Sequence, residues 1–135
     1  MSLKKILLIE DERINAMAFQ KGLAKVSTST TLILHETAES GLAFLKSVEN
    51  LPDLIILDLN LPRMNGIDFL NVIKKDDVFK KIPVIILTTS VNPKDKIDCF
   101  ELQVAGYFIK PIDYFDLIKS VFEYWANSEF VYSDR

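Results

Sequence analysis

Residues 51–66 read LPDLIILDLNLPRMNG, and this stretch decides the fold. Its apolar run, Leu54–Leu57, lacks the alternating polar face of a half-exposed strand. It therefore predicts a strand buried on both sides, as in a parallel sheet covered by helices. The run ends at Asp58, after which Asn60, Pro62 and Gly66 turn the chain. We expect Asp58 at the carboxyl end of this strand, which is the edge where open α/β sheets bind their ligands.

The composition predicts one globular domain without a membrane span. The chain has 135 residues, of which 49% are hydrophobic and 26% charged, as in ordinary globular proteins. We assign residues 1–127 to a single domain and residues 128–135, which lack an evident packing partner, to a C-terminal tail. No apolar run is long enough to cross a bilayer, and no secretion signal opens the chain.

Charge and cysteine content narrow the classes of partner. Sixteen Lys and Arg against nineteen Asp and Glu give a formal net charge of −3, which disfavours direct binding to nucleic acid phosphates. The single cysteine, Cys99, cannot form an internal disulfide or a cysteine-based metal site, which fits a reducing compartment. We expect a cytoplasmic protein that binds neither nucleic acid nor membranes directly.

Strand patterns alternate with helix patterns along the whole chain. Such alternation is typical of an α/β fold with a doubly wound, five-stranded parallel sheet. In the fourth helix, Ile97, Phe100 and Val104 fall at helical spacing and predict its buried face. The predicted strands cover residues 4–9, 31–35, 53–58, 82–87 and 107–109. The predicted helices cover residues 14–26, a segment beginning at Thr37 or Ser40, residues 66–75, a segment beginning at Pro93, and a last segment capped by Asp113.

Polar side chains follow four of these strands at the points where the strands end. Acids follow the first, Asp58 the third, Thr88 the fourth and Lys110 the fifth. Because the carboxyl ends of parallel strands meet at one edge, we expect these groups to converge. The carboxylates of Glu10, Asp11 and Asp58, with the backbone carbonyl of Asn60, offer the hard oxygen ligands that suit Mg²⁺, or Mn²⁺ in its place.

This arrangement makes Asp58 a candidate nucleophile. A single acid at a strand end is more often merely solvated, but here it is accompanied by a cation, a hydroxyl and further acids. With Mg²⁺ shielding its charge, the Asp58 carboxylate could attack a phosphoryl group. Lys110 would neutralise the added oxygens, and Thr88 would donate a hydrogen bond to them.

Four motifs in this order resemble the receiver domain of two-component response regulators. They are EDE at residues 10–12, DLNLPRMNG at residues 58–66, LTTS at residues 87–90 and GYFIKP at residues 106–111. The resemblance covers residues 4–127 and is to the stand-alone, single-domain type. It implies a flavodoxin-like receiver fold with strand order 2-1-3-4-5.

The resemblance also implies a function and residue roles. A sensor histidine kinase would phosphorylate the chain, and the phosphoryl group would shift a conformational equilibrium toward a second state. The output would be the face formed by the fourth helix, fifth strand and fifth helix, read by an unidentified downstream protein. Such a domain is a phosphoacceptor that catalyses only its own phosphoryl transfer and hydrolysis. The implied roles are phosphoacceptor for Asp58, metal-binding acidic pair for Glu10 and Asp11, phosphoryl stabiliser for Lys110, stabiliser and switch for Thr88, and rotating switch aromatic for Tyr107.

Two alternatives share this chemistry. The chain could be a phosphorelay intermediate that passes the phosphoryl group from Asp58 to a histidine phosphotransfer protein. A phosphatase of the haloacid-dehalogenase type also uses an aspartyl nucleophile with Mg²⁺, but it needs a second aspartate two residues on, where this chain has Asn60. By the resemblance, Asn60 and Ser90 occupy variable positions that help set the lifetime of the phosphoryl group.

Three aromatic residues lie off the predicted core faces. Phe108, Phe115 and Tyr124 are expected to face solvent, and large apolar groups exposed together suggest a protein contact. A homodimer through the fourth-helix, fifth-strand and fifth-helix face is one interpretation. Scattered exposure without function is the other.

Overall fold

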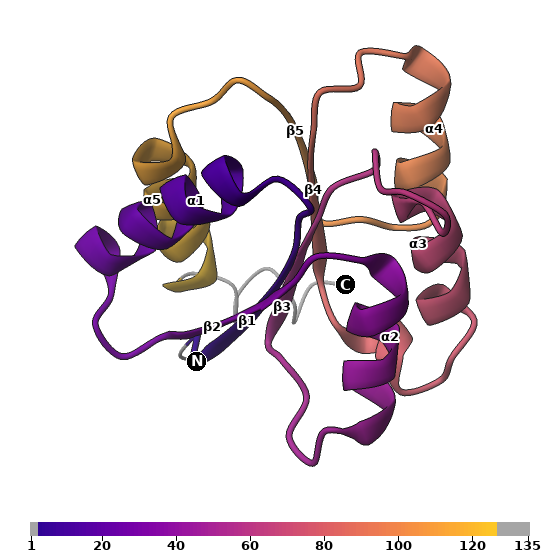
Figure 1. The fold of residues 1–135 in the computed structure, drawn as a ribbon, viewed down its shortest axis with the longest axis horizontal. Coiled ribbons are helices and arrows are strands. Elements are labelled where there is room, and N and C mark those ends of the chain that lie inside the picture. Colours follow the sequence, from indigo (N-terminus) through magenta and orange to yellow (C-terminus); the bar gives the residue numbers. More distant parts are fainter. Residues whose placement is uncertain (1–2, 127–135) are drawn as a thin grey trace.

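The computed structural model describes residues 3–126, which form a five-stranded parallel sheet with helices on both faces (Figure 1). The strands are β1 (Lys5–Ile9), β2 (Thr31–His35), β3 (Leu54–Leu57), β4 (Val84–Thr88) and β5 (Gly106–Ile109). The helices are α1 (Arg13–Val26), α2 (Ala38–Ser47), α3 (Gly66–Lys74), α4 (Pro93–Glu101) and α5 (Tyr114–Ala126), with a short 3₁₀ turn, η1 (Phe79–Lys81). The strand order β2-β1-β3-β4-β5 confirms the predicted fold class and topology. The predicted tail, residues 128–135, lies outside the described residues.

The register of the central strands aligns their carboxyl ends. Ile9 of β1 pairs with Leu57 of β3, and Leu57 pairs with Ile86 of β4. The residues that follow Ile9 and Leu57, namely Glu10 and Asp58, therefore emerge side by side. Every residue of β3 is buried, as its uninterrupted apolar run predicts.

Helices α1 and α5 cover one face of the sheet, and α2, α3 and α4 cover the other (Figure 1). Each face has its own apolar core, one centred on Phe19 with Trp125 and the other on Phe69 with Leu70. The predicted caps are present: Thr37 accepts a hydrogen bond from the Ser40 amide, and Asp113 accepts one from the Asp116 amide. Among the described residues, no helix is both long and apolar enough to cross a membrane.

The buried face of α4 differs from the prediction. Ile97 and Phe100 are 56% and 48% exposed, whereas Cys99 is fully buried. Val104, which lies beyond the end of α4, is buried as predicted. The Ser90 hydroxyl donates a 2.6 Å hydrogen bond to Asp95 in the first turn of α4. Because residues four apart share a helix face, fixing Asp95 toward the β4–α4 loop turns Cys99 toward the sheet and the apolar pair outward.

The three expected surface aromatics divide into two groups. Phe115 and Tyr124 of α5 are exposed, by 37% and 39%. Phe108 is only half-buried rather than free in solvent, because it packs against the core beneath α5 although its strand lies at the edge of the sheet. Phe108 was expected to face solvent, and it does so only in part.

Candidate functional site

The carboxyl edge of the sheet gathers the buried polar side chains. Within residues 3–126, the buried polar or charged residues are Glu10, Asp58, Thr88 and Lys110, with exposures of 3%, 4%, 0% and 7%. They follow or end strands β1, β3, β4 and β5. Burial of a charge is costly unless it is paired, so this concentration at one edge indicates a site rather than a structural accident.

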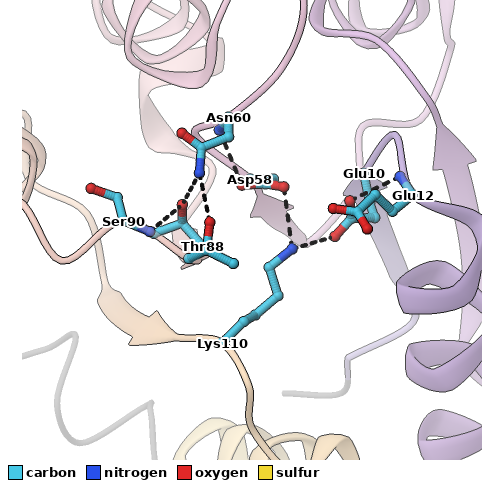
Figure 2. Close-up of polar contacts among 8 residues, drawn as sticks. Glu10, Glu12, Asp58, Asn60, Thr88, Ser90 and Lys110 are labelled. Carbon is cyan, nitrogen blue, oxygen red and sulfur yellow. Dashed lines mark hydrogen bonds and ion pairs between the residues drawn. The ribbon is translucent and has the colours of Figure 1, made fainter.

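Lys110 lies at the centre of the group. Its Nζ donates to Glu10 Oε1 at 2.8 Å and to Asp58 Oδ2 at 3.2 Å (Figure 2). Burial by itself lowers the pKa of Lys110, but the hydrogen bond from Lys110 to Glu10 and the negative charges of Asp58 and Glu10 outweigh it, so the net pKa is raised. Lys110 is thus held as a cation beside the Asp58 carboxylate.

The Asp58 carboxylate is fixed from two sides. One oxygen faces Lys110, and the other, Oδ1, accepts a 3.1 Å hydrogen bond from the backbone amide of Asn60. The Asp58 carbonyl lies against Gly66, where an added Cβ would clash with that oxygen and lie 2.6 Å from the Leu59 Cα. Glycine at this position lets α3 begin directly against the end of β3, which keeps the loop that carries Asp58 compact.

Glu10, Asp11 and Glu12 form a cluster of acids. Their ligand oxygens lie within 4.8 Å of one another, and Glu10 Oε2 also accepts the Glu12 amide at 3.1 Å. Burial raises the pKa of Glu10, an effect partly opposed by its hydrogen bond to Lys110. With Asp58 added, the carboxylates outnumber the single ammonium of Lys110, so the donor set is hard, oxygen-rich and net negative. Such a set fits Mg²⁺ or Mn²⁺.

Glu12 was not among the metal ligands expected from the sequence. That set joined Glu10 and Asp11 to Asp58 and the Asn60 carbonyl. The structure clusters Glu12 with the first two acids instead, while Lys110 links Asp58 to Glu10. The run of three consecutive acids was the sequence signal that pointed to Glu12.

The side chain of Asn60 connects the β3–α3 loop with the β4–α4 loop. Its Nδ2 donates to Thr89 Oγ1 at 2.9 Å and to Thr88 Oγ1 at 3.3 Å. Thr88 Oγ1 also accepts the backbone amide of Ser90 at 3.2 Å (Figure 2). The sequence pattern identified Thr88 as a site residue but did not predict the contact between Asn60 and Thr89. A side-chain amide that links two loops has no sequence signature.

Tyr107 lies one step farther from Asp58. Its hydroxyl donates to the Ser90 carbonyl at 3.2 Å, and its half-buried ring packs beside Phe100, with ring centroids 6.5 Å apart. Burial raises the pKa of Tyr107. Thr88, Ser90 and Tyr107 therefore form a continuous path from the charged cluster toward α4 and β5.

The sequence model of the family called response regulator receiver domain matches residues 6–122, which is most of the chain. The chain belongs to this family. Receiver domains are the phosphoacceptors of two-component signalling. They interact with sensor histidine kinases, and they bind Mg²⁺ or Mn²⁺ at an acidic pocket, which confirms the cofactor expected from the sequence.

The similar proteins include response regulators of comparable length. Response regulator Rcp1 of Synechocystis sp. is 36% identical over 133 residues, with 93% of this chain and 90% of that protein covered. The phosphorylated cyanobacterial phytochrome response regulator RcpA superposes with a TM-score of 0.85 at 32% identity, covering 94% of this chain and 96% of RcpA. The Mn²⁺-bound form of Rcp1 gives a TM-score of 0.81 at 37% identity, covering 90% and 94%.

Proposed function

We propose that Asp58 accepts a phosphoryl group from the phosphohistidine of a sensor histidine kinase. In this step the P–N bond of the phosphohistidine breaks, a P–O bond to the Asp58 carboxylate forms, and the imidazole leaves with the electron pair of the broken bond. The observation that carries the proposal is the buried Asp58 carboxylate with Lys110 Nζ at 3.2 Å. A carboxylate held beside a fixed cation, at the edge where strands deliver ligands, is arranged to receive an anionic group.

A divalent cation completes the site in this proposal. Glu10, Asp11, Asp58 and the Asn60 carbonyl would hold it, with Glu12 adjacent to the first two acids. The cation would neutralise phosphoryl oxygens as they approach the carboxylates. The Mn²⁺-bound form of Rcp1 supports this assignment, because that protein is 37% identical to this chain.

Lys110 and Thr88 would stabilise the phosphorylated form. Lys110 already bridges Glu10 and Asp58 as a cation, so it is placed to contact an added phosphoryl oxygen without a change of protonation. Thr88 would donate its hydroxyl proton to another phosphoryl oxygen. Both contacts are made only in the phosphorylated state, which is the condition for a population shift.

The output surface would be formed by α4, β5 and α5. Movement of Thr88 would act on Ser90, whose carbonyl holds the Tyr107 hydroxyl, and would free Tyr107 to rotate. Exposed apolar side chains on these elements include Ile97, Phe100, Ile109, Phe115 and Tyr124. A protein partner or a second copy of the chain would bind there, with a histidine phosphotransfer protein as the alternative recipient of the phosphoryl group.

We also propose that this face forms a phosphorylation-dependent homodimer, to which Phe108, Phe115 and Tyr124 contribute. Phe115 and Tyr124 are exposed on α5, and Phe108 is half-buried on β5 beside it. The measurement is molar mass in solution with and without beryllofluoride. We expect a shift toward twice the monomer mass only with beryllofluoride, and reversal of that shift by Phe115→Ala. A monomer under both conditions would contradict the dimer but not the phosphoacceptor chemistry.

Intact mass after incubation with acetyl phosphate and Mg²⁺ tests the proposed phosphorylation directly. We expect a single phosphoryl adduct that is absent without metal and absent in Asp58→Asn. The matched control is Asp53→Asn, because Asp53 lies at the opposite end of the same strand, where its carboxylate accepts the Lys4 and Lys5 amides. An adduct that persists in Asp58→Asn would place the phosphoacceptor elsewhere, and no adduct together with no beryllofluoride binding would refute the proposed function.

A further inference from the structure

The Asn60 side-chain amide points toward two hydroxyl groups, those of Thr88 and Thr89 (Figure 2). Asn60 itself is exposed, but one of its acceptors, Thr88, is completely buried. The amide thus ties the loop after β3 to the loop that begins at the end of β4. An exposed side chain with a bond of 2.9 Å to Thr89 and a second contact to a buried hydroxyl has a defined position rather than free rotation.

The acceptor capacity of the Thr88 hydroxyl is filled by this arrangement. A hydroxyl oxygen offers two lone pairs. Thr88 Oγ1 accepts one hydrogen bond from Asn60 Nδ2 at 3.3 Å and another from the Ser90 backbone amide at 3.2 Å. The two donors belong to the loops that follow β3 and β4, and neither bond involves Asp58. Movement of the Thr88 hydroxyl toward a phosphoryl group on Asp58 would therefore stretch or break both bonds.

Through Ser90, the hydrogen bonds of Thr88 continue to α4 and β5. The Ser90 hydroxyl donates to Asp95 at 2.6 Å, and the Ser90 carbonyl accepts the Tyr107 hydroxyl at 3.2 Å. A restraint on Thr88 is consequently a restraint on the loop that precedes α4. The amide of Asn60 lies at the start of this path, next to the phosphoacceptor.

We propose that the Asn60 amide is a latch that holds the Thr88 and Thr89 hydroxyls in the unphosphorylated arrangement and so opposes occupation of the site by a phosphoryl group. This inference rests on the proposed function for its consequence, but the latch itself exists in the unphosphorylated protein. Asn60 is then a positioning residue, which acts on the phosphoryl group through Thr88. Removing the latch stabilises the occupied state relative to the free state.

The first test measures the side-chain conformation of Thr88 in the metal-free, unphosphorylated protein. Methyl scalar couplings in NMR report the χ1 rotamer populations of Thr88. We expect one dominant rotamer in the native protein and a mixture in Asn60→Ala. The matched control is Asn71→Ala, because the Asn71 amide donates only within α3, to the Ile67 carbonyl at 3.1 Å. An unchanged Thr88 rotamer in Asn60→Ala overturns the latch, whether or not the protein accepts phosphate.

The second test measures the affinity for beryllofluoride with Mg²⁺. Asn60→Ala removes both amide contacts, which in this proposal exist only in the free state. Taken together as worth about one ordinary hydrogen bond, their loss predicts about threefold to tenfold tighter binding. Thr89→Val removes the shorter of the two Asn60 contacts and should tighten binding in the same direction. The double variant should bind no more tightly than Asn60→Ala, because both changes remove the same bridge.

The outcomes separate the latch from the proposed function. Weaker beryllofluoride binding in Asn60→Ala would mean that the amide supports the occupied state, and additive effects of the two changes would mean that they act separately. Either result overturns the latch while the phosphoacceptor role stands. Failure of the native protein to bind beryllofluoride refutes the proposed function instead, and the Thr88 rotamer measurement then decides the latch independently.

Discussion

Helices α3 and α4 each contain nine residues and cover the same face of the sheet, but they are anchored very differently. Helix α3 buries Gly66, Phe69, Leu70 and Ile73, whereas α4 buries only Cys99. This difference in burial suggests that the two helices have different roles. Helix α3 begins against Asp58 and supports the loop that carries this residue, whereas α4 buries little apolar surface, so we expect its displacement to cost less free energy.

Truncating one phenylalanine on each helix tests this contrast most strongly. Phe69 is completely buried and Phe100 is 48% exposed. We expect Phe69→Ala to lower the free energy of unfolding by about 3–5 kcal/mol, from lost burial and the cavity that remains. Phe100→Ala should lower it by less than about 1 kcal/mol.

Urea unfolding at equilibrium measures both variants against the native protein. The slope with urea should be unchanged, so that the shift in midpoint reports stability alone. Equal losses for the two phenylalanines would show that α4 is anchored as firmly as α3. The proposed output through α4 would then need a costlier movement than the structure suggests.

The sequence predicted the buried face of α3 correctly but that of α4 only in part, and the reason is physical. Leu70 and Ile73 point inward as their spacing predicts, because the apolar residues of α3 dominate one side of the helix. In α4, Ile97 and Phe100 are the most apolar residues, yet Cys99 faces the core. We attribute the rotation of α4 to the hydrogen bond from Ser90 to Asp95, and hydrophobic periodicity contains no information about such a contact.

The charged part of the site could be predicted from the sequence. Asp58 and Lys110 could be placed together from sequence because each follows a strand of a parallel sheet, and strand ends share an edge. The partners of Asn60 could not, since an amide that crosses between loops depends on the final loop geometry. The roles in phosphoryl transfer and switching stay predictions, which the adduct and beryllofluoride measurements address.

Removing one cap from each helix gives a smaller and more local test. Asn65 caps α3 in a reciprocal capping box with Asp68, and Asn92 caps α4 through the Lys94 amide. We expect Asn65→Ala to cost about 0.5–2 kcal/mol of global stability. Asn92→Ala should leave the urea midpoint nearly unchanged but accelerate amide hydrogen exchange in α4. Global destabilisation by Asn92→Ala as large as that by Asn65→Ala would argue against a weakly anchored α4.

The smallest expected effect concerns the contact between Tyr107 and the loop that precedes α4. Burial raises the pKa of Tyr107 above its ordinary value of 10.0, and the nearby side chain of Ser90 opposes part of this shift. A raised pKa means that the stabilising contribution is fully present below pH 10.0 and is lost as pH rises through the folded-state value. Tyr107→Phe removes both the titration and the hydrogen bond.

The stability difference between native protein and Tyr107→Phe should therefore be constant up to about pH 10, the ordinary value for tyrosine, and shrink as pH rises further. We expect a change below about 1 kcal/mol, because the ring is half-buried and solvent screens its charge. Urea unfolding of both proteins at each pH measures it, and taking the difference cancels the titration of the lysines and of Tyr114. A difference independent of pH would mean that the phenol does not hold Ser90 in solution, and the path from Thr88 to β5 would end at Ser90 and Asp95.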